Sequence, residues 1–150
     1  MKPVGDGPFA YFAKIDKIYR KMCAEAVTEY DFSPAEIVVL MFLSNHPGVN
    51  TSKDIANYRN MSKGLVARAV DSLYKKGYLY VEKDESDRRL LHLYLSDQCG
   101  EIVERLQECK KTFWLEMHRG IPEEQMEVFQ DTIRRMYDNV DNMSCPSEEE

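Results

Sequence analysis

The stretch SKGLVARAVDSLYKKGYL, residues 62–79, contains a helix start, an amphipathic repeat and a helix stop. Ser62 is a favoured N-cap residue, and Gly77 follows two lysines, as is typical where a helix ends in a left-handed glycine. Between them, apolar side chains recur at the three- and four-residue spacing of one buried helical face. These side chains are Val66, Ala69, Val70 and Leu73. The stretch predicts a helix over residues 62–76 that buries one face and exposes the other.

The spacing of apolar residues changes directly after this helix. Residues 78–83 (YLYVEK) are rich in strand formers, and residues 91–95 (LHLYL) alternate leucine with His and Tyr. The residues between them, 84–89 (DESDRR), are all polar. This pattern predicts a β-hairpin with a charged tip.

Two further helix starts precede residue 62. Thr51-Ser52-Lys53-Asp54 is a capping signature that starts a short helix through Tyr58, and Ser33-Pro34-Ala35-Glu36 predicts a capping box. The latter starts a helix over residues 34–45 that is almost wholly apolar and is therefore expected to be buried. Two short helices joined by a turn and followed by a hairpin form a winged helix-turn-helix, here over residues 33–95.

Amphipathic helices are predicted on both sides of this lobe, over residues 9–30, 96–119 (capped by Ser96) and 122–140. They are too apolar on one face for a monomer of this size, which predicts a dimer interface built from residues 9–30 and 97–141. Its core is expected to contain Phe9, Phe12, Ile15, Met126, Phe129, Ile133 and Met136. The expected fold class is mainly α with a small β-hairpin wing. The chain is read as one domain, residues 1–150, that ends in a flexible tail over residues 144–150.

Length and composition fit one globular domain: 150 residues, 43% hydrophobic and 31% charged. The net charge of −6 conceals a basic centre, because residues 51–95 carry nine basic and six acidic side chains, whereas residues 96–150 carry six and fourteen. This local basic patch determines the electrostatic attraction of a polyanion that contacts it, since salt screens more distant charges over about 10 Å.

No segment indicates a membrane or an export signal. The longest apolar run, residues 37–43, is too short to span a bilayer, and residues 1–10 lack the apolar block of a signal peptide. These features predict a cytoplasmic protein that does not contact a membrane. The cysteines form no CxxC pair and are expected to be reduced, although a redox role for one of them stays open. They are Cys23, Cys99, Cys109 and Cys145.

From the short helix to the end of the wing, the chain resembles the multiple-antibiotic-resistance regulator (MarR) family of bacterial transcription factors. The likeness extends over about residues 9–140. It is carried by Asp54-Ile55-Ala56, by residues 65–79 with Leu-x-x-x-Gly before the wing, by Asp87-Arg88-Arg89 at its tip, and by Leu93-Tyr94-Leu95-Ser96. Cys99 departs from the family pattern, which usually has glycine there. The resemblance implies a homodimeric regulator, more often a repressor, that binds double-stranded DNA at a pseudo-palindromic operator and responds to a ligand.

The exposed face of the helix over residues 62–76 fits the major groove of DNA. We expect contacts from Ser62, Lys63, Gly64, Ala67 and Arg68. An arginine can bridge guanine O6 and N7, a lysine can reach guanine or phosphate, and an alanine can touch a thymine methyl group. Arg68 is therefore expected to read a guanine, and Ala67 a thymine.

The hairpin tip is expected to contact DNA independently of the helix. Asp87 and Arg89 lie two residues apart, so both would point to one side of an extended strand. The family resemblance implies that Asp87 holds Arg89 in the minor groove, where A·T-rich sequences attract arginine. Phosphate contacts are expected from Lys83 and Arg88, and from Thr51, Ser52 and Lys53 at the start of the short helix.

The resemblance also implies a small aromatic or phenolic effector. Candidate pocket residues are Tyr11, Tyr19, Tyr30, Trp114 and His118. No metal or cofactor is expected, because relatives that bind zinc use paired histidines on the fifth helix, where this chain has only His118. Relatives that sense peroxides have a cysteine where this chain has Phe9.

Two other classes of function are weighed against a DNA-binding regulator. An enzyme is not indicated, because the chain has no Gly-rich phosphate loop, GxSxG or HExxH motif. The second alternative is a winged-helix module that binds proteins without specific DNA binding. A wing of that kind has no need of Asp87 beside Arg88 and Arg89 at its tip. The sequence does not distinguish a repressor from an activator.

Overall fold

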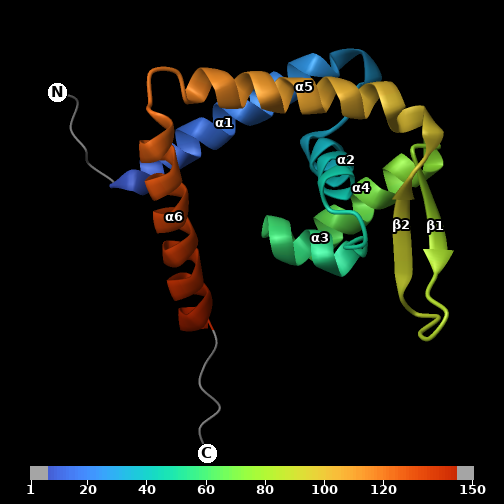
Figure 1. Ribbon diagram of the computed structural model, residues 1–150. Coiled ribbons are helices and arrows are strands. Elements are labelled where there is room, and N and C mark those ends of the chain that lie inside the picture. The colour runs from blue at the N-terminus through green and yellow to red at the C-terminus, as the bar shows by residue number, and fades with distance from the viewer. Residues whose placement is uncertain (1–6, 145–150) are drawn as a thin grey trace, which may run out of the picture. The chain divides into compact units, whose positions relative to one another are not determined.

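The computed structural model describes residues 7–144 and contains six α-helices and one two-stranded sheet in that range (Figure 1). The helices are α1 (Pro8–Ala26), α2 (Pro34–Asn45), α3 (Ser52–Arg59), α4 (Lys63–Lys75), α5 (Gly100–Met117) and α6 (Glu123–Ser144). The strands β1 (Leu79–Lys83) and β2 (Leu91–Leu95) pair antiparallel, with Leu79 opposite Leu95 and Lys83 opposite Leu91. The mainly helical fold class with a hairpin wing is therefore confirmed. The chain divides into two compact units within α5, one ending at Phe113 and the other starting at Trp114.

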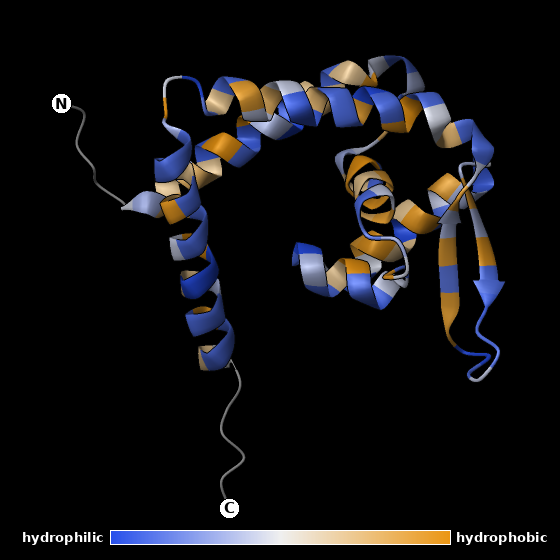
Figure 2. Cartoon of the chain, viewed as in Figure 1, coloured by the Kyte–Doolittle hydropathy of each residue, from blue (hydrophilic) through white to orange (hydrophobic). Residues whose placement is uncertain are grey.

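The core of the first unit forms around α2, which is apolar along nearly its whole length (Figure 2). Val39 and Leu40 of α2 are fully buried, and so are side chains from the helices and strands that follow. The fully buried partners are Ile55, Val66, Leu73, Ile102 and Leu106, with Leu79 and Leu93 of the two strands nearly so. Each strand thus contributes alternate side chains to the core and leaves the others outside, as the period of two requires.

The predicted capping residues of the lobe are confirmed. Ser33 with Glu36 and Thr51 with Asp54 both form complete capping boxes, and the Ser62 hydroxyl accepts the Leu65 N–H at the start of α4. At the end of α4, Gly77 has a φ of 82° and Tyr78 N–H donates to the Leu73 carbonyl at 2.9 Å. That left-handed conformation favours glycine and directs the chain from α4 into β1.

The end of α1 and one burial assignment differ from the prediction. α1 ends at Ala26 rather than near residue 30, because a 3-10 turn at Thr28–Tyr30 and a left-handed Asp31 follow it. Val70 is half-buried rather than buried, at the edge of the apolar face of α4.

The predicted helix start at Ser96 is also wrong. The Ser96 hydroxyl donates to the Gly77 carbonyl at 2.7 Å instead of capping a helix, and a 3-10 turn at Asp97–Cys99 precedes α5. Cys99, which replaces the glycine of the family pattern, is buried and donates its thiol hydrogen to the Tyr78 carbonyl at 3.1 Å. Ser96 and Cys99 therefore tie the end of the wing back to its beginning.

The second unit buries little of its apolar surface. None of the side chains described in residues 114–143 is classed as buried. No helix within residues 7–144 combines the length and the apolarity that crossing a bilayer requires. The expected tail over residues 144–150, with Cys145, lies outside the described residues except for the backbone of Ser144.

Candidate nucleic-acid interface

The polar face of α4 is open to solvent, as the sequence predicts. Ser62, Lys63, Gly64, Ala67 and Arg68 are all exposed, whereas Val66, Ala69 and Leu73 on the opposite face are buried. A Cβ atom built on Gly64 would meet only the Arg68 guanidinium, at 4.0 Å. The guanidinium of Arg68 therefore lies near the helix N-terminus, where the backbone N–H groups favour an anion.

A buried carboxylate fixes α4 against α2. Glu36 is only 3% exposed and accepts three hydrogen bonds, from Ser33 N–H at 2.7 Å, Ser72 Oγ at 2.6 Å and Lys76 Nζ at 2.9 Å. Burial alone would raise the pKa of Glu36, but these hydrogen bonds and the Lys76 charge together lower it below its ordinary value. Glu36 thus remains ionised and joins the start of α2 to the last turn of α4.

The wing tip is organised by the carboxylate of Asp84. Its Oδ1 accepts hydrogen bonds from Ser86 N–H at 2.8 Å, Ser86 Oγ at 2.6 Å and Asp87 N–H at 2.9 Å. These bonds, together with one from His92, hold the pKa of Asp84 well below its usual range. The tip is a set of turns closed by side-chain hydrogen bonds, which orders a segment that contains no strand.

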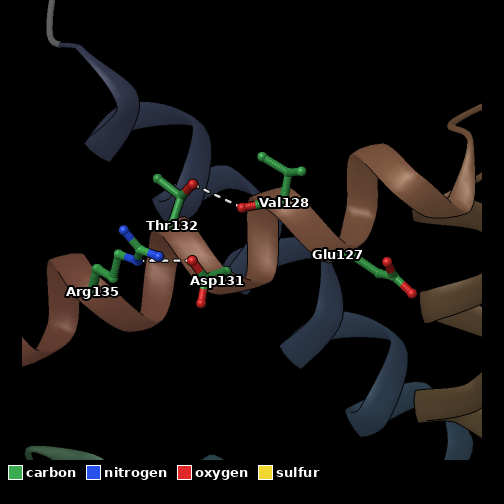
Figure 3. A pocket seen from close by; sticks show the side chains of 5 residues that line it. All are labelled: Glu127, Val128, Asp131, Thr132 and Arg135. Atoms are coloured by element: carbon green, nitrogen blue, oxygen red, sulfur yellow. Dashed lines mark hydrogen bonds and ion pairs between the residues drawn. The ribbon is translucent and has the colours of Figure 1, made fainter.

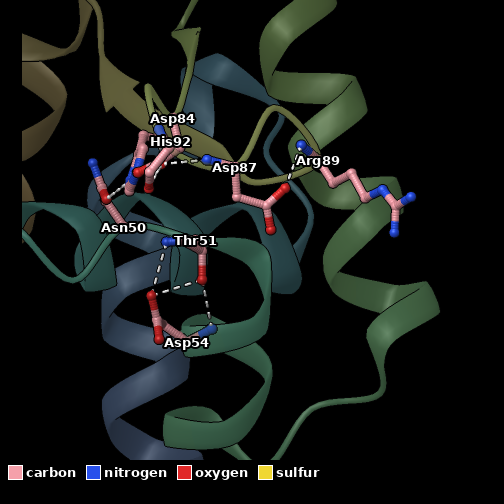
Figure 4. A network of polar contacts seen from close by, with 8 residues as sticks. Asn50, Thr51, Asp54, Asp84, Asp87, Arg89 and His92 are labelled. Atoms are coloured by element: carbon pink, nitrogen blue, oxygen red, sulfur yellow. Dashed lines mark hydrogen bonds and ion pairs between the residues drawn. The ribbon is translucent and has the colours of Figure 1, made fainter.

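Asp87 holds the backbone of Arg89 rather than its side chain. Asp87 Oδ1 accepts the Arg89 N–H at 3.0 Å, and Figure 4 shows the guanidinium pointing away from this carboxylate. The expectation of an extended strand with Asp87 and Arg89 on one side is wrong, because residues 84–90 turn. In this arrangement Asp87 fixes where the Arg89 side chain leaves the backbone, and the guanidinium stays free to contact a ligand.

The wing is also joined to the segment before α3, and sequence reasoning missed this connection. His92 Nε2 lies 2.9 Å from Asp84 Oδ2, and its Nδ1 lies 2.7 Å from Asn50 Oδ1 (Figure 4). The Asn50 carbonyl accepts the Leu93 N–H at 2.8 Å. Asn50 is buried and directly precedes Thr51, the cap of α3. The hairpin signal predicts the strands but gives no indication that position 92 faces position 50.

The basic side chains of this surface are exposed and lack acidic partners. They are Lys53, Lys63, Arg68, Lys83, Arg88 and Arg89. Across residues 7–144, the ion pairs of the structure include none of these six. Unpaired cations on three neighbouring elements of one lobe form a surface suited to a polyanion.

The side chain of Thr51, a predicted phosphate contact, instead caps α3. Thr51 is only 9% exposed, and its hydroxyl donates to Asp54 at 2.7 Å and accepts the Asp54 N–H at 3.1 Å. The expectation that Thr51 binds phosphate is wrong because this side chain is committed to the α3 cap. Ser52 is half-buried and Lys53 is exposed, so these two remain candidates at this helix start.

The candidate effector residues lie in separate contacts within the described chain. Tyr19 packs on Phe113 with ring centroids 5.1 Å apart, and Tyr30 stacks on Phe32 at 5.6 Å. Tyr11 is exposed. In the second unit, Trp114 packs on His118, whose buried Nε2 has no hydrogen-bond partner in the described structure.

The cysteines of the first unit are packing residues with unfavourable conditions for a thiolate. Cys23 and Cys109 Sγ atoms lie 3.9 Å apart between α1 and α5. Burial is the larger cause, and the neighbouring Cys23 the smaller, of a rise in the pKa of Cys109 to about 12. Burial also raises the pKa of Cys23. Within residues 7–144, no three His, Cys, Asp or Glu side chains gather as a metal site would require.

The residues expected at a dimer interface lie on α1 and α6. Phe9, Phe12, Ile15, Phe129 and Met136 are exposed, whereas Met126 and Ile133 are half-buried. α6 also carries a pocket lined by its own residues Glu127, Val128, Asp131, Thr132 and Arg135 (Figure 3). Because these residues all belong to one helix, the pocket is a depression on a helix surface, and it contains none of the candidate effector residues.

Comparison with known proteins identifies the family to which this lobe is similar. Residues 30–90 match the sequence model of the MarR family. Over 121 residues the chain is 26% identical to the HTH-type transcriptional regulator YdgJ of Bacillus subtilis, a match that covers 81% of this chain and 72% of YdgJ. The segment that matches the family model, residues 30–90, begins at the 3-10 turn before α2 and ends at the wing tip.

Solved structures share the fold along nearly the whole chain. The structure of S. aureus MepR in complex with DNA aligns with a TM-score of 0.72 at 18% identity, covering 87% of this chain and 96% of MepR. The structure of Bordetella bronchiseptica BpsR, whose DNA binding is regulated by 6-hydroxynicotinic acid, aligns with a TM-score of 0.69 at 16% identity, covering 92% and 98%. At these identities the likeness shows the fold alone.

Proposed function

Because the chain belongs to the MarR family of winged helix-turn-helix transcriptional regulators, which bind DNA and are not enzymes, we propose that it is a ligand-responsive repressor. In this proposal it acts as a homodimer on a pseudo-palindromic operator. The observation that carries the proposal is the group of six exposed basic side chains on α3, α4 and the wing, none of them in an ion pair within residues 7–144.

The proposed contacts follow from where each side chain lies. Arg68 reads guanine and Lys63 reaches guanine or phosphate, while Ala67 touches a thymine methyl group. Ser62 and Gly64 bring the N-terminus of α4 close to a phosphate. At the wing, Arg89 enters an A·T-rich minor groove while Arg88 and Lys83 bind phosphates, with Ser52 and Lys53 binding phosphate at α3.

The homodimer is supported by the apolar side chains that the outer helices expose. On α6, Phe129 is 43% and Met136 46% exposed, and on α1 Phe9 is 75% exposed. A second copy of the chain would bury these rows and set two recognition helices one DNA turn apart, roughly 34 Å. That spacing predicts two half-sites related by two-fold symmetry.

A small aromatic acid is the effector class that the proposal favours. BpsR, which has the same fold, is regulated by 6-hydroxynicotinic acid. In this chain, Tyr19, Tyr30 and Tyr11 of the first unit, and Trp114 and His118 of the second, are the aromatic side chains proposed to contact such a ligand. Tyr19, Tyr30 and His118 are half-buried, whereas Tyr11 and Trp114 are exposed.

Fluorescence anisotropy on duplex DNA from upstream of the chain's own coding region tests the proposal. We expect tight binding that weakens between about 50 and 200 mM salt, and weaker binding to a scrambled duplex. Two protomers per duplex are expected in sedimentation. Equal, weak binding to duplexes covering the neighbouring promoters would contradict a specific operator. Transcription from the bound promoter in vitro then distinguishes repression from activation.

A further inference from the structure

We propose that His92 is a positioning residue for the wing, and that it fixes the tip for DNA only while its imidazole is protonated. The ring lies between two segments that are far apart in the chain. Nε2 contacts Asp84 Oδ2 at 2.9 Å and Nδ1 contacts Asn50 Oδ1 at 2.7 Å (Figure 4). No DNA-contacting role is assigned to His92 itself. It acts through the wing residues that Asp84 holds.

The two partners set the protonation state that the geometry requires. A carboxylate oxygen and an amide oxygen are both acceptors, so each ring nitrogen must carry a hydrogen to bond both of them. A neutral imidazole has one N–H and loses one of the two bonds. This pair of hydrogen bonds, the His92 clamp, is therefore sensitive to the loss of a single proton, and histidine is the side chain that most often gains or loses a proton near neutral pH.

Two acidic side chains and one amide face the ring from the elements packed against it. Asp84 faces Nε2 from the start of the tip, and Glu82 lies directly opposite His92 on β1. From the segment before α3 the facing group is the neutral Asn50, followed by the Thr51 and Asp54 cap. Hydrogen bonds from Ser86 and His92 hold the pKa of Asp84 well below its usual range, so its carboxylate stays ionised throughout.

The contacts of these partners connect the ring to the DNA-binding surface. The Asp84 carboxylate also accepts hydrogen bonds from Ser86 and Asp87, and Asp87 in turn holds the backbone of Arg89. On the other side, Asn50 precedes the cap of α3. A protonated His92 therefore fixes the tip relative to the α3 start, and deprotonation frees one of these two attachments.

This inference rests on the proposed use of the wing as a DNA contact, and a pH series tests it. Anisotropy titrations on the operator duplex at constant ionic strength would compare wild type with His92→Gln, and with His46→Gln as the control. Wild-type affinity is expected to fall about tenfold between about pH 5.5 and 8.5, the loss of one charge-assisted hydrogen bond. The His92→Gln profile is expected to be flat, and the His46→Gln control should keep the wild-type profile. A wild-type slope in His92→Gln overturns the proposal.

Asn50→Asp is a second variant, which should strengthen the pH response that His92→Gln removes. A carboxylate beside Nδ1 stabilises the imidazolium, so the midpoint of the affinity profile should move to higher pH. A structural role for Asn50 alone would lower affinity at every pH and leave the midpoint unchanged. An unchanged midpoint in a folded Asn50→Asp protein contradicts the clamp.

NMR of the DNA-free protein separates this inference from the proposed function. The His92 ring resonances and the amides of Ser86, Asp87 and Arg89 should titrate with one midpoint, and His92→Gln should abolish the amide shifts. If Asn50 instead donates from its NH₂ to a neutral ring, the backbone amide resonances will not change with pH together with the ring resonances. That result would contradict the proposal. If the amide resonances do follow the ring but Arg89→Ala binds DNA as wild type does, the clamp stands and the proposed minor-groove contact fails.

Discussion

The winged-helix lobe, residues 33–95, and the terminal helix α6 use charged and apolar side chains in opposite ways. In the lobe, apolar side chains are buried around α2, and exposed cations such as Arg68 and Arg89 have no acidic partner within residues 7–144. In α6, Arg134 and Arg135 both pair with Asp131, while Phe129 and Tyr137 are 43% and 68% exposed.

The difference indicates what kind of partner each region requires. Exposed cations without partners keep their full attraction for phosphate, whereas cations already in surface ion pairs offer little of it. Exposed apolar rows gain free energy only when another protein surface covers them. The lobe is therefore suited to a polyanion such as DNA, and α6 is suited to another protein surface, which we propose is a second copy of the chain.

The largest expected effect comes from placing charges on the apolar row of α6. Phe129→Glu with Met136→Glu should raise the dimer dissociation constant more than about 100-fold, because each buried anchor is typically worth about 2 kcal/mol or more. Sedimentation velocity over a concentration series measures the shift, and operator affinity should fall with it. Asp138→Asn on the same helix is the control and should stay dimeric. A fully dimeric double variant would show that α6 does not form the interface.

Removing one unpaired cation from the lobe is the next largest change. Arg89→Ala and Arg68→Ala should each weaken operator binding by about 1–3 kcal/mol per half-site. Arg89→Ala should act at A·T-rich flanks, and Arg68→Ala should relax the preference at one base. Titrations on a set of single-base operator variants measure both effects. The exposed Lys111 of α5 is the matched control, because Lys111→Ala removes the same charge outside the lobe. Equal losses on all duplexes would make Arg68 a phosphate contact.

The sequence predicts the local features of the lobe and misses its long-range polar contacts. Helix starts at Ser33, Thr51 and Ser62 and the stop at Gly77 depend on neighbours within four residues, so local patterns suffice to find them. The His92 contact joins residues 42 apart, and the Ser72 contact to Glu36 joins residues 36 apart. Periodicity cannot show which polar residues meet across the core.

The errors at Ser96 and Asp87 have the same physical origin. Both residues match a local signal, a helix cap for Ser96 and an extended pair for Asp87. In the structure, the Ser96 hydroxyl bonds the Gly77 carbonyl 19 residues earlier, and the Asp84 carboxylate turns the chain before Asp87. The sequence does contain a signal for the turn before Asp87, since Asp84-Glu85-Ser86 favours a turn in which the Asp side chain accepts backbone hydrogen bonds.

Glu36 provides a test of how the lobe keeps α4 in place. Glu36→Gln removes the charge that pairs with Lys76 and should lower the free energy of unfolding by about 1–2 kcal/mol, because Lys76 is 40% exposed and partly compensated by water. Since folding lowers the pKa of Glu36, its stabilisation is present above the unfolded pKa of about 4.3 and is lost as the pH falls through the folded value. Urea unfolding from about pH 3 to 7 should show the two proteins converging at low pH. Glu25→Gln, at an exposed pair, should change stability by less than about 0.5 kcal/mol at any pH.

The smallest expected effect separates folding from binding on the recognition helix itself. Gly64→Ala should raise the free energy of unfolding by up to about 0.5–1 kcal/mol, since glycine is unfavourable in a helix and the new methyl would meet only Arg68 Nη1 at 4.0 Å. The same methyl occupies the surface proposed to approach DNA, so operator affinity should fall about threefold, or about 0.7 kcal/mol. Gly100→Ala, at the open start of α5, should give the gain in stability without the loss in binding. Equal behaviour of the two variants in both measurements would place the DNA elsewhere on the lobe, because a stabilised helix with unchanged affinity has no close contact at position 64.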